Sequence, residues 1–214
     1  MAELDRTRPY ARPRTVRLLA GAVLAVGLAL AVFGVAYAVN GATQAQGEVE
    51  VPVTLTVPAG QSAVPLPRGD LPPGSRLETA ADHMVLRSFG STVAEQLVSR
   101  GDTLLFGLAA GIGGVLLRRL LLSVAEGRPF RAGNAGRIAG VAVLVAFAGT
   151  LGPVLPQLAG VMVLDRLGLT GPDGPFRVGV SFPLLPLLVM PVLLALAEAF
   201  RRGAELADDV RGLV

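Results

Sequence analysis

The residues best suited to chemistry are few in this chain and stand apart from one another. Its one histidine, His83, follows Asp82, and cysteine is absent. A protein metal site needs several converging ligands, which a lone histidine without cysteines does not supply. We therefore predict no metal site and no cofactor, and we interpret His83 as an exposed loop residue.

Candidate nucleophiles are equally isolated. Ser91, Ser99 and Ser123 lack the flanking motif of a nucleophile elbow. The glycine cluster Gly111-Ile112-Gly113-Gly114 lies inside an apolar run rather than at the strand-to-helix turn that cradles phosphate. Because ion-coupled carriers commonly place ionisable groups at the centre of a span, and no apolar run here has one, an ion pump is disfavoured. We predict that the protein is not an enzyme.

Four uncharged apolar runs dominate the sequence. Crossing a hydrocarbon core of roughly 30 Å takes about 20 mostly apolar helical residues. The composition agrees, since 52% of residues are hydrophobic and 16% are charged. We predict an all-α membrane protein, a four-helix transmembrane bundle with a small β-containing extracytoplasmic segment. The runs are Leu18–Val39, Thr103–Leu117, Ile138–Leu164 and Val178–Ala197.

The first run has an alternative interpretation. An arginine-rich leader, an apolar stretch and Ala36-Tyr37-Ala38 imitate a cleavable signal peptide. The uncharged stretch Leu18–Val39 is longer than the roughly 7–15 residues of a signal sequence's apolar region. We therefore favour an uncleaved membrane anchor.

The distribution of arginine orients the chain. Every basic residue is arginine. Arginines gather in residues 1–17 and 118–137, whereas residues 40–102 are rich in acids. By the positive-inside rule, both termini and residues 126–137 are cytoplasmic in a bacterial inner membrane. Because these arginines flank apolar runs rather than cluster on one accessible face, we expect no direct binding to nucleic acid.

These assignments divide the chain into nine segments. They are a cytoplasmic leader 1–17, a first span 18–39, an extracytoplasmic segment 40–102, a second span 103–125, a cytoplasmic turn 126–137, a third span 138–160, an extracytoplasmic loop 161–177, a fourth span 178–197 and a cytoplasmic tail 198–214. The second span extends past Arg118 and Arg119 because their long side chains can reach the headgroups. The leader is expected to be disordered.

The extracytoplasmic segment contains strand and helix signals. Residues 48–57 alternate apolar and polar side chains, although Pro52 predicts an edge position or a bulge. A second strand is predicted within residues 76–89, after a proline-rich stretch at 58–74. Two strands form only a marginal unit, so the segment should lean on the membrane bundle or on a partner. We also expect Ser91 to cap a helix over 92–99 and Asp102 to cap the second span.

Prolines interrupt the last two runs. The third contains Pro153 and Pro156, which leaves two interpretations: a span ending near them followed by an interfacial segment to Asp165, or one kinked and tilted span. The fourth contains Pro183, Pro186 and Pro191 and should be bent and packed against other helices.

Two pairs of glycines are spaced one helical turn apart. They are Gly107 with Gly111 and Gly136 with Gly140, and they allow close approach of helix backbones. We favour intramolecular packing of the second span over dimerisation.

The polar residues that stand out lie in the predicted cytoplasmic turn and tail. Gly127 suits the end of a helix and Pro129 forbids its continuation, so a tight reversal is predicted. Glu198 precedes two arginines at helical spacing and is predicted to form an ion pair. The candidate partner-binding or structural residues are Gly127, Arg128, Pro129, Phe130, Asn134, Arg137, Glu198, Phe200, Arg201, Arg202, Gly203, Glu205 and Asp209.

The turn Gly127-Arg128-Pro129-Phe130, the following Asn134 and Arg137, and the exit Ala197–Gly203 with its Leu213-Val214 terminus resemble an uncharacterised bacterial family. This is domain-of-unknown-function family 2975, made of small four-span membrane proteins. The resemblance covers residues 15–214. It implies a link to regulation at the membrane, because genes of the family are often neighbours of small helix-turn-helix regulators.

Two functions follow as hypotheses. In the first, the protein is structural or regulatory, and its turn and tail bind a cytoplasmic regulator protein; the alternative for these arginines is that they hold topology and contact anionic lipid of the bilayer. In the second, the protein is a small transporter or channel subunit. One copy offers few polar pore-lining residues beyond Thr150 and Gln157, so a pore would require a homo-oligomer.

Overall fold

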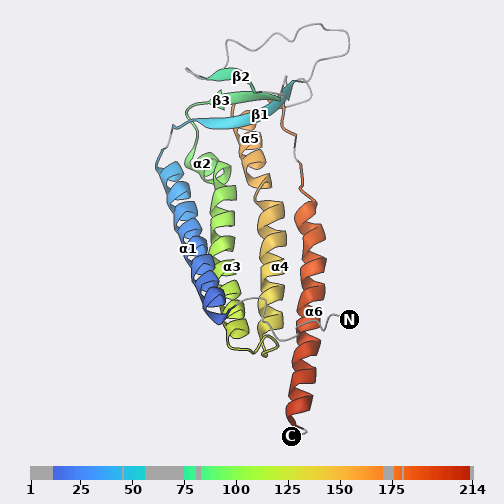
Figure 1. The fold of residues 1–214 in the computed structure, drawn as a ribbon. Coiled ribbons are helices and arrows are strands. Elements are labelled where there is room, and N and C mark those ends of the chain that lie inside the picture. Colours follow the sequence, from blue (N-terminus) through green and yellow to red (C-terminus); the bar gives the residue numbers. More distant parts are fainter. Residues whose placement is uncertain are drawn as a thin grey trace, which may run out of the picture.

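The computed structural model describes residues 12–44, 46–55, 75–80, 83–170, 176–179 and 181–212. Some of our expectations concern residues outside these ranges. They are those for most of the leader, for the proline-rich stretch 58–74, for Asp82 and for the Leu213-Val214 terminus. Four long helices run along one another, and a sheet with two shorter helices covers one end (Figure 1). The helices are α1 (Pro13–Thr43), α2 (Val93–Ser99), α3 (Gly101–Ala125), α4 (Asn134–Leu151), α5 (Val154–Arg166) and α6 (Leu185–Gly212). The strands are β1 (Val49–Leu55), β2 (Arg76–Ala80), β3 (His83–Ser88) and β4 (Phe176–Arg177).

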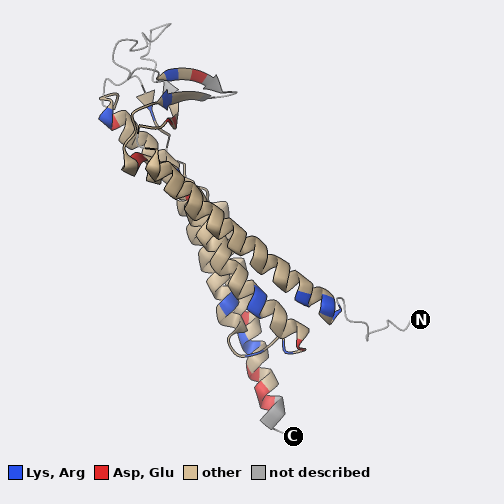
Figure 2. Ribbon diagram, turned by 90° about the vertical axis from the view of Figure 1, so that its left-hand side faces the viewer, with Lys and Arg blue, Asp and Glu red and all other residues tan. Residues whose placement is uncertain are grey.

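Three helical stretches are long and apolar enough to cross a membrane. They are α1, α3 and the nearly continuous pair α4 and α5 (Asn134–Arg166). Charged residues of the described chain lie toward the two ends of the bundle and leave its middle uncharged (Figure 2). Large apolar side chains cover the outside of this middle, and Val32 and Val192 are each about two-thirds exposed. Such a surface suits lipid rather than water.

The third apolar run is interrupted at its prolines, which is compatible with both of our interpretations, a span followed by an interfacial segment or one kinked span. The α4 helix ends at Leu151, and α5 begins at Val154 after Gly152 and Pro153. Gly152 leaves room for the ring of Phe106 on α3, which an added Cβ would approach to 2.9 Å. The break therefore coincides with a close contact between helices.

The fourth run is helical only in its second part. We predicted a span over Val178–Ala197, whereas α6 begins at Leu185. A residue that precedes proline disfavours helical backbone angles, and Pro183 imposes this on Phe182, shortly before the helix begins. Gln157 pairs with the non-helical part: its Oε1 accepts from the Ser181 amide at 2.6 Å, and its Nε2 donates to the Ser181 carbonyl at 3.2 Å. The side-chain amide thus satisfies backbone groups that a helix would have satisfied.

Two predicted helix caps were wrong. Thr92, not Ser91, caps α2, through a reciprocal capping box in which Thr92 and Glu95 each accept from the other's amide. Ser91 instead donates to the Gly47 carbonyl at 2.6 Å. The α3 helix begins at Gly101, one residue before Asp102, so the Asp102 carboxylate accepts from the adjacent Thr103 amide within the first turn. The predicted end of this helix at Ala125 is confirmed.

The sheet is antiparallel, with strand order β2-β3-β1-β4. The predicted alternation is confirmed over residues 49–53, because Val49, Val51 and Val53 are buried while Glu50 and Pro52 are exposed, and residues 56–57 lie outside the described chain. The single strand predicted within 76–89 is instead the pair β2 and β3, and His83 begins β3 rather than lying in a loop. Two-residue β4 is too short to leave an alternating pattern.

Pro52 lies in a strand with a neighbour on each side, not in an edge strand as one of our expectations had it. Its partner on β3 is Val85, whereas β4 pairs only with Thr54 and Leu55. In the described register β1 is therefore paired on one side at Pro52, which accommodates a residue without an amide hydrogen.

The sheet packs on the end of the helix bundle, as predicted from its small size. Val51 and Leu86 from the sheet form one core with Val163 and Leu164 of α5. All four side chains are almost completely buried. The sheet thus relies on α5 for its hydrophobic core.

A seam of glycines joins α1 to α3. A Cβ on Gly107 would lie 2.5 Å from the Leu30 carbonyl oxygen, and one on Gly111 would lie 2.9 Å from Ala31, so the predicted intramolecular packing is confirmed. Sequence analysis missed their partners on α1, which are Gly27 and Gly34. A Cβ added to Gly27 or Gly34 would lie 2.5 or 2.7 Å, respectively, from a backbone oxygen of α3. The other predicted pair differs, since Gly140 faces Leu116 whereas Gly136 has open space.

Candidate functional site

The turn between α3 and α4 is closed by backbone hydrogen bonds. Gly127 adopts a left-handed conformation with φ of +73°, which confirms its predicted place after the helix end. Its amide donates to the Val124 carbonyl at 3.0 Å, and the Arg128 amide donates to the Ser123 carbonyl at 2.9 Å. Pro129 follows at once, so the chain reverses within a few residues.

Asn134 is the centre of this turn. It is completely buried, and its Nδ2 donates to the Ser123 hydroxyl at 2.6 Å and to the Pro129 carbonyl at 2.7 Å. Its Oδ1 accepts from Arg137 at 2.6 Å. One amide therefore fixes the end of α3, the turn and the start of α4, and both Asn134 and Arg137 are structural residues of the turn.

Substituting Asn134 tests this role. We expect Asn134→Ala to lower the free energy of unfolding by about 1–2 kcal/mol, because the Pro129 carbonyl and the buried Ser123 hydroxyl each lose the hydrogen bond that Asn134 donates. Thermal unfolding of the purified protein in detergent measures the effect. The matched control is Arg128→Ala, an exposed residue of the same turn, for which we expect less than about 0.5 kcal/mol. Equal effects of the two variants would contradict the assignment.

Aromatic packing ties the turn to α6. The rings of Phe130 and Phe200 lie 5.4 Å apart at 52°, a tilted pair. A Cβ on Gly203 would approach the Phe130 ring to 2.5 Å, so glycine leaves room for it. The predicted turn and tail residues are therefore brought together at Phe130, Phe200 and Gly203.

Charged residues follow the aromatic contact along α6. Glu198 pairs with Arg201 at 2.7 Å and with Arg202 at 2.8 Å, which confirms the predicted ion pair, and Arg201 also reaches Glu205. The hydrogen bonds from Arg201 and Arg202 hold the pKa of Glu198 at about 2, and the Glu198 carboxylate in turn raises the pKa of Arg201. These ion pairs are internal to α6. Arg128, Arg202, Glu205 and Asp209 are all exposed.

The opposite end of the bundle holds an ion pair that sequence analysis missed. The Glu95 carboxylate, with a side chain 3% exposed, accepts from Arg166 Nε at 2.8 Å. Its other oxygen accepts from the Thr92 amide. The pair joins the start of α2 to the end of α5, and no sequence pattern links residues 71 positions apart.

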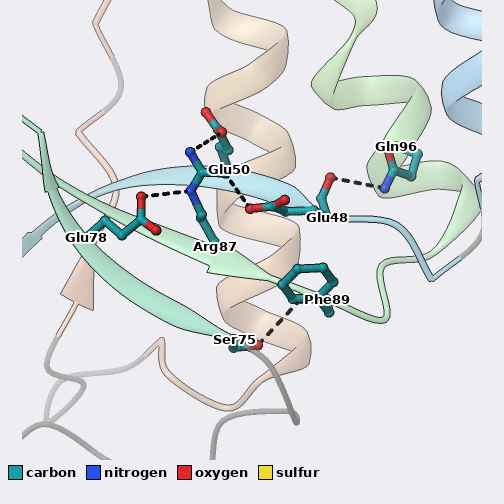
Figure 3. A network of polar contacts seen from close by, with 7 residues as sticks. All are labelled: Glu48, Glu50, Ser75, Glu78, Arg87, Phe89 and Gln96. Atoms are coloured by element: carbon teal, nitrogen blue, oxygen red, sulfur yellow. Dashed lines mark hydrogen bonds and ion pairs between the residues drawn. The ribbon is translucent and has the colours of Figure 1, made fainter.

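Arg87 forms a second ionic centre on the sheet. From β3 it reaches Glu48 at 2.8 Å, Glu50 of β1 at 3.0 Å and Glu78 of β2 at 3.0 Å (Figure 3). The hydrogen bond with Glu48, together with the charges of all three acids, raises the pKa of Arg87. One arginine therefore pairs with three carboxylates, so the net charge of these four side chains is negative.

Gln96 is completely buried and lies beside Glu48 (Figure 3). Its Nε2 donates to the Glu48 carbonyl at 3.4 Å and to Ser91 Oγ at 2.6 Å. The side chain therefore connects α2 to the start of β1.

The bundle also has an open apolar cavity of about 580 Å³. Its walls come from α1, α3 and α4, with Pro186 of α6 at one side. Every lining residue is glycine, alanine, valine, leucine, phenylalanine or proline, so the space suits hydrocarbon and offers no group for acid–base chemistry. Within the described residues, no three His, Asp or Glu side chains gather as a metal site.

Comparison with known proteins assigns neither a family nor a function to the chain. No protein-family model matches the chain, and neither the curated proteins nor the solved structures include a match. The resemblance to family 2975 stays a prediction that rests on the turn and tail residues.

Proposed function

We propose that the protein is a four-span protein of the bacterial cytoplasmic membrane, with both termini inside, and that it acts structurally or in regulation by binding a cytoplasmic protein through the end of α6. Three of the four spans correspond to the long apolar helices α1, α3 and α4 with α5. The proposal concerns the fourth span, the orientation and the partner.

The fourth span would combine a short helix with the non-helical segment before it. The 13 uncharged residues Leu185–Ala197 are about 20 Å long as a helix, short of the roughly 30 Å of hydrocarbon. Residues 178–184 supply the rest of the apolar length. Non-helical backbone at membrane depth is tolerated where its polar groups are satisfied by protein, and Gln157 does this for Ser181.

The orientation rests on the arginines at the lower end of the bundle (Figure 2). Arg14 and Arg17 begin α1, and Arg118, Arg119 and Arg137 flank the turn. Cytoplasmic ends of spans carry such an excess of basic residues.

One observation carries the proposed partner site: α6 continues as a helix beyond the turn and projects past the rest of the bundle (Figure 1). Leu206 on this projection is 67% exposed, between Glu205 and Asp209. The Phe130–Phe200 contact fixes the base of the projection. An exposed leucine flanked by acids on an anchored helix suits a partner with an apolar pocket rimmed by basic residues.

A co-purification experiment tests the partner site. The protein is crosslinked in cells and recovered from membranes as the intact chain, a Leu206→Asp variant and a Leu188→Asn control. Leu188 is 66% exposed on the same helix but lies in the apolar section. We expect Leu206→Asp to lose a specific cytoplasmic protein by about tenfold or more and the control to keep it. If the intact chain and both variants recover the same proteins in equal amounts, the proposed partner site is wrong. The arginines of the turn and tail would then serve to contact lipid.

The absence of cysteine from the sequence makes topology easy to measure. Single cysteines at Glu78 and Glu205 provide one reporter at each end of the bundle. We expect a membrane-impermeant maleimide to label Glu78→Cys on intact cells and to label Glu205→Cys only after lysis, as the positive-inside rule requires. Labelling of Glu205→Cys on intact cells would show that the tail lies outside and would contradict the proposed orientation.

The alternative function, an oligomeric transporter or channel subunit, stays a prediction. Both amide atoms of Gln157 are engaged with Ser181, and the Thr150 hydroxyl is buried. In one copy Gln157 is thus occupied by Ser181, and the Thr150 hydroxyl is withdrawn from solvent. Flux into reconstituted vesicles is the measurement that addresses this alternative.

A further inference from the structure

A second cavity, of about 500 Å³, lies at the end of the bundle beneath the sheet. It differs from the apolar cavity because charged groups of both signs line it. Tyr37 and Gln44 come from the end of α1, Glu48 and Glu50 from the start of β1, and Arg100, Asp102 and Thr103 from the start of α3. The cavity is at the level where the uncharged section of α3 ends.

Arg100 enters this cavity without a carboxylate partner. Its guanidinium lies over the Tyr37 ring at 4.9 Å and donates to the Gln44 side chain at 3.3 Å and to the Tyr37 carbonyl at 3.5 Å. These acceptors are neutral, and no ion pair joins Arg100 to another residue of the described chain. Its charge is therefore available to an anion.

Asp102 is in the complementary position. Its carboxylate accepts only from the Thr103 amide and hydroxyl, and within the described residues no arginine pairs with it. Glu48 and Glu50 beside it share the single cation Arg87 (Figure 3). One wall of the cavity therefore carries a free positive charge, and the rest carries an excess of negative charge.

We propose that this cavity binds a zwitterion that carries a primary ammonium close to a phosphate. Arg100 would take the phosphate, since guanidinium donors match its oxygens. Asp102, Glu48 and Glu50 would take the ammonium, whose three N–H groups need acceptors. The shared chemistry is that of a phosphoethanolamine group, which is found both as a soluble metabolite and as a headgroup of membrane lipids.

The charges predict which related headgroups are rejected. A trimethylated ammonium has no N–H donor and is held by aromatic cages, whereas the Tyr37 ring is already covered by Arg100. A phosphoglycerol group has the phosphate but no cation for the carboxylates. We therefore expect phosphoethanolamine lipid to bind at least about tenfold better than phosphocholine or phosphoglycerol lipid.

The test uses the full-length protein, freed of lipid in detergent and returned to nanodiscs. One series has discs with phosphatidylethanolamine, phosphatidylcholine or phosphatidylglycerol as the minor lipid, and bound lipid is counted by native mass spectrometry. A second series adds soluble phosphoethanolamine to discs that lack the first lipid. Binding in the first series alone assigns the lipid as the source; binding in the second assigns the soluble compound.

Substitutions test the positive charge and the negative charge of the cavity one at a time. Arg100→Gln and Asp102→Asn should each lower binding at least about tenfold. Arg100→Lys keeps a positive charge but loses the guanidinium fork, so it should bind more weakly than the intact protein and more tightly than Arg100→Gln. This graded loss would not arise from a variant that merely fails to fold. Arg76→Gln, an exposed strand arginine outside the cavity, is the matched control. Equal binding of the three lipids together with no binding of phosphoethanolamine overturns the proposal, as does unchanged binding by both Arg100→Gln and Asp102→Asn.

Discussion

Arg166→Met is expected to lower the free energy of unfolding by about 3 kcal/mol, the low end for breaking a buried ion pair, because it leaves the Glu95 carboxylate without its cation. Glu95 cannot turn to water, since its side chain is only 3% exposed and also caps α2. The Arg166 side chain is 29% exposed, which keeps the expected loss at the lower end. Thermal unfolding in detergent measures the change, and hydrogen exchange of β1 shows whether the sheet loosens first.

A second substitution distinguishes the charge from the shape of the pair. Glu95→Gln in the Arg166→Met background removes the buried charge while the amide oxygen can still accept from Thr92, as glutamine does in capping boxes. The double variant should recover most of the lost stability, a coupling that a double-mutant cycle reports. Arg76→Met, at an exposed strand position, serves as the control with less than about 0.5 kcal/mol. A double variant no more stable than Arg166→Met would refute the account.

The parts of the fold predicted from sequence are those encoded by local patterns. Apolar length marked the long helices, alternation marked β1, and Gly127 with Pro129 marked the turn. The fourth run shows the limit of composition, because Val178–Leu184 is uncharged and mostly apolar, like the first part of the helix after it. Its structure depends on Pro183 and on a hydrogen-bond partner, Gln157, that lies more than twenty residues away.

The candidate site was likewise predicted from the sequence only in part. The contact of Phe130 with Phe200 joins a turn and a tail that each stood out in the sequence, although only the fold brings them together. Pairs such as Glu95 with Arg166 have no local signature, because each charge alone is typical of a solvated surface and no sequence pattern relates positions 71 residues apart. Arg100 and Asp102 were likewise close in sequence, but their cavity exists only because α1 and β1 return to the start of α3.

The glycine seam between α1 and α3 gives the remaining large prediction. Gly34→Leu should lower the free energy of unfolding by about 3 kcal/mol, the upper range for overpacking, because its first added atom meets the Thr103 carbonyl oxygen at 2.7 Å. Backbone cannot move aside as a flexible side chain can, so α1 must shift along its length. The matched control is Gly21→Leu on the same helix, where an added Cβ has open space within 4 Å.

The two α1 variants should differ in sign as well as in size. Leucine favours a helix over glycine by up to about 1 kcal/mol, so Gly21→Leu should be neutral or stabilising while Gly34→Leu is not. Gly107 faces Gly34 across the seam, with a Cβ on Gly34 lying 3.3 Å from the Gly107 Cα. Because Gly34→Leu already forces α1 and α3 apart, adding Gly107→Leu to it should lower the free energy of unfolding by less than Gly107→Leu does alone. Equal melting temperatures for Gly21→Leu and Gly34→Leu would show that close backbone contact does not hold α1 to α3.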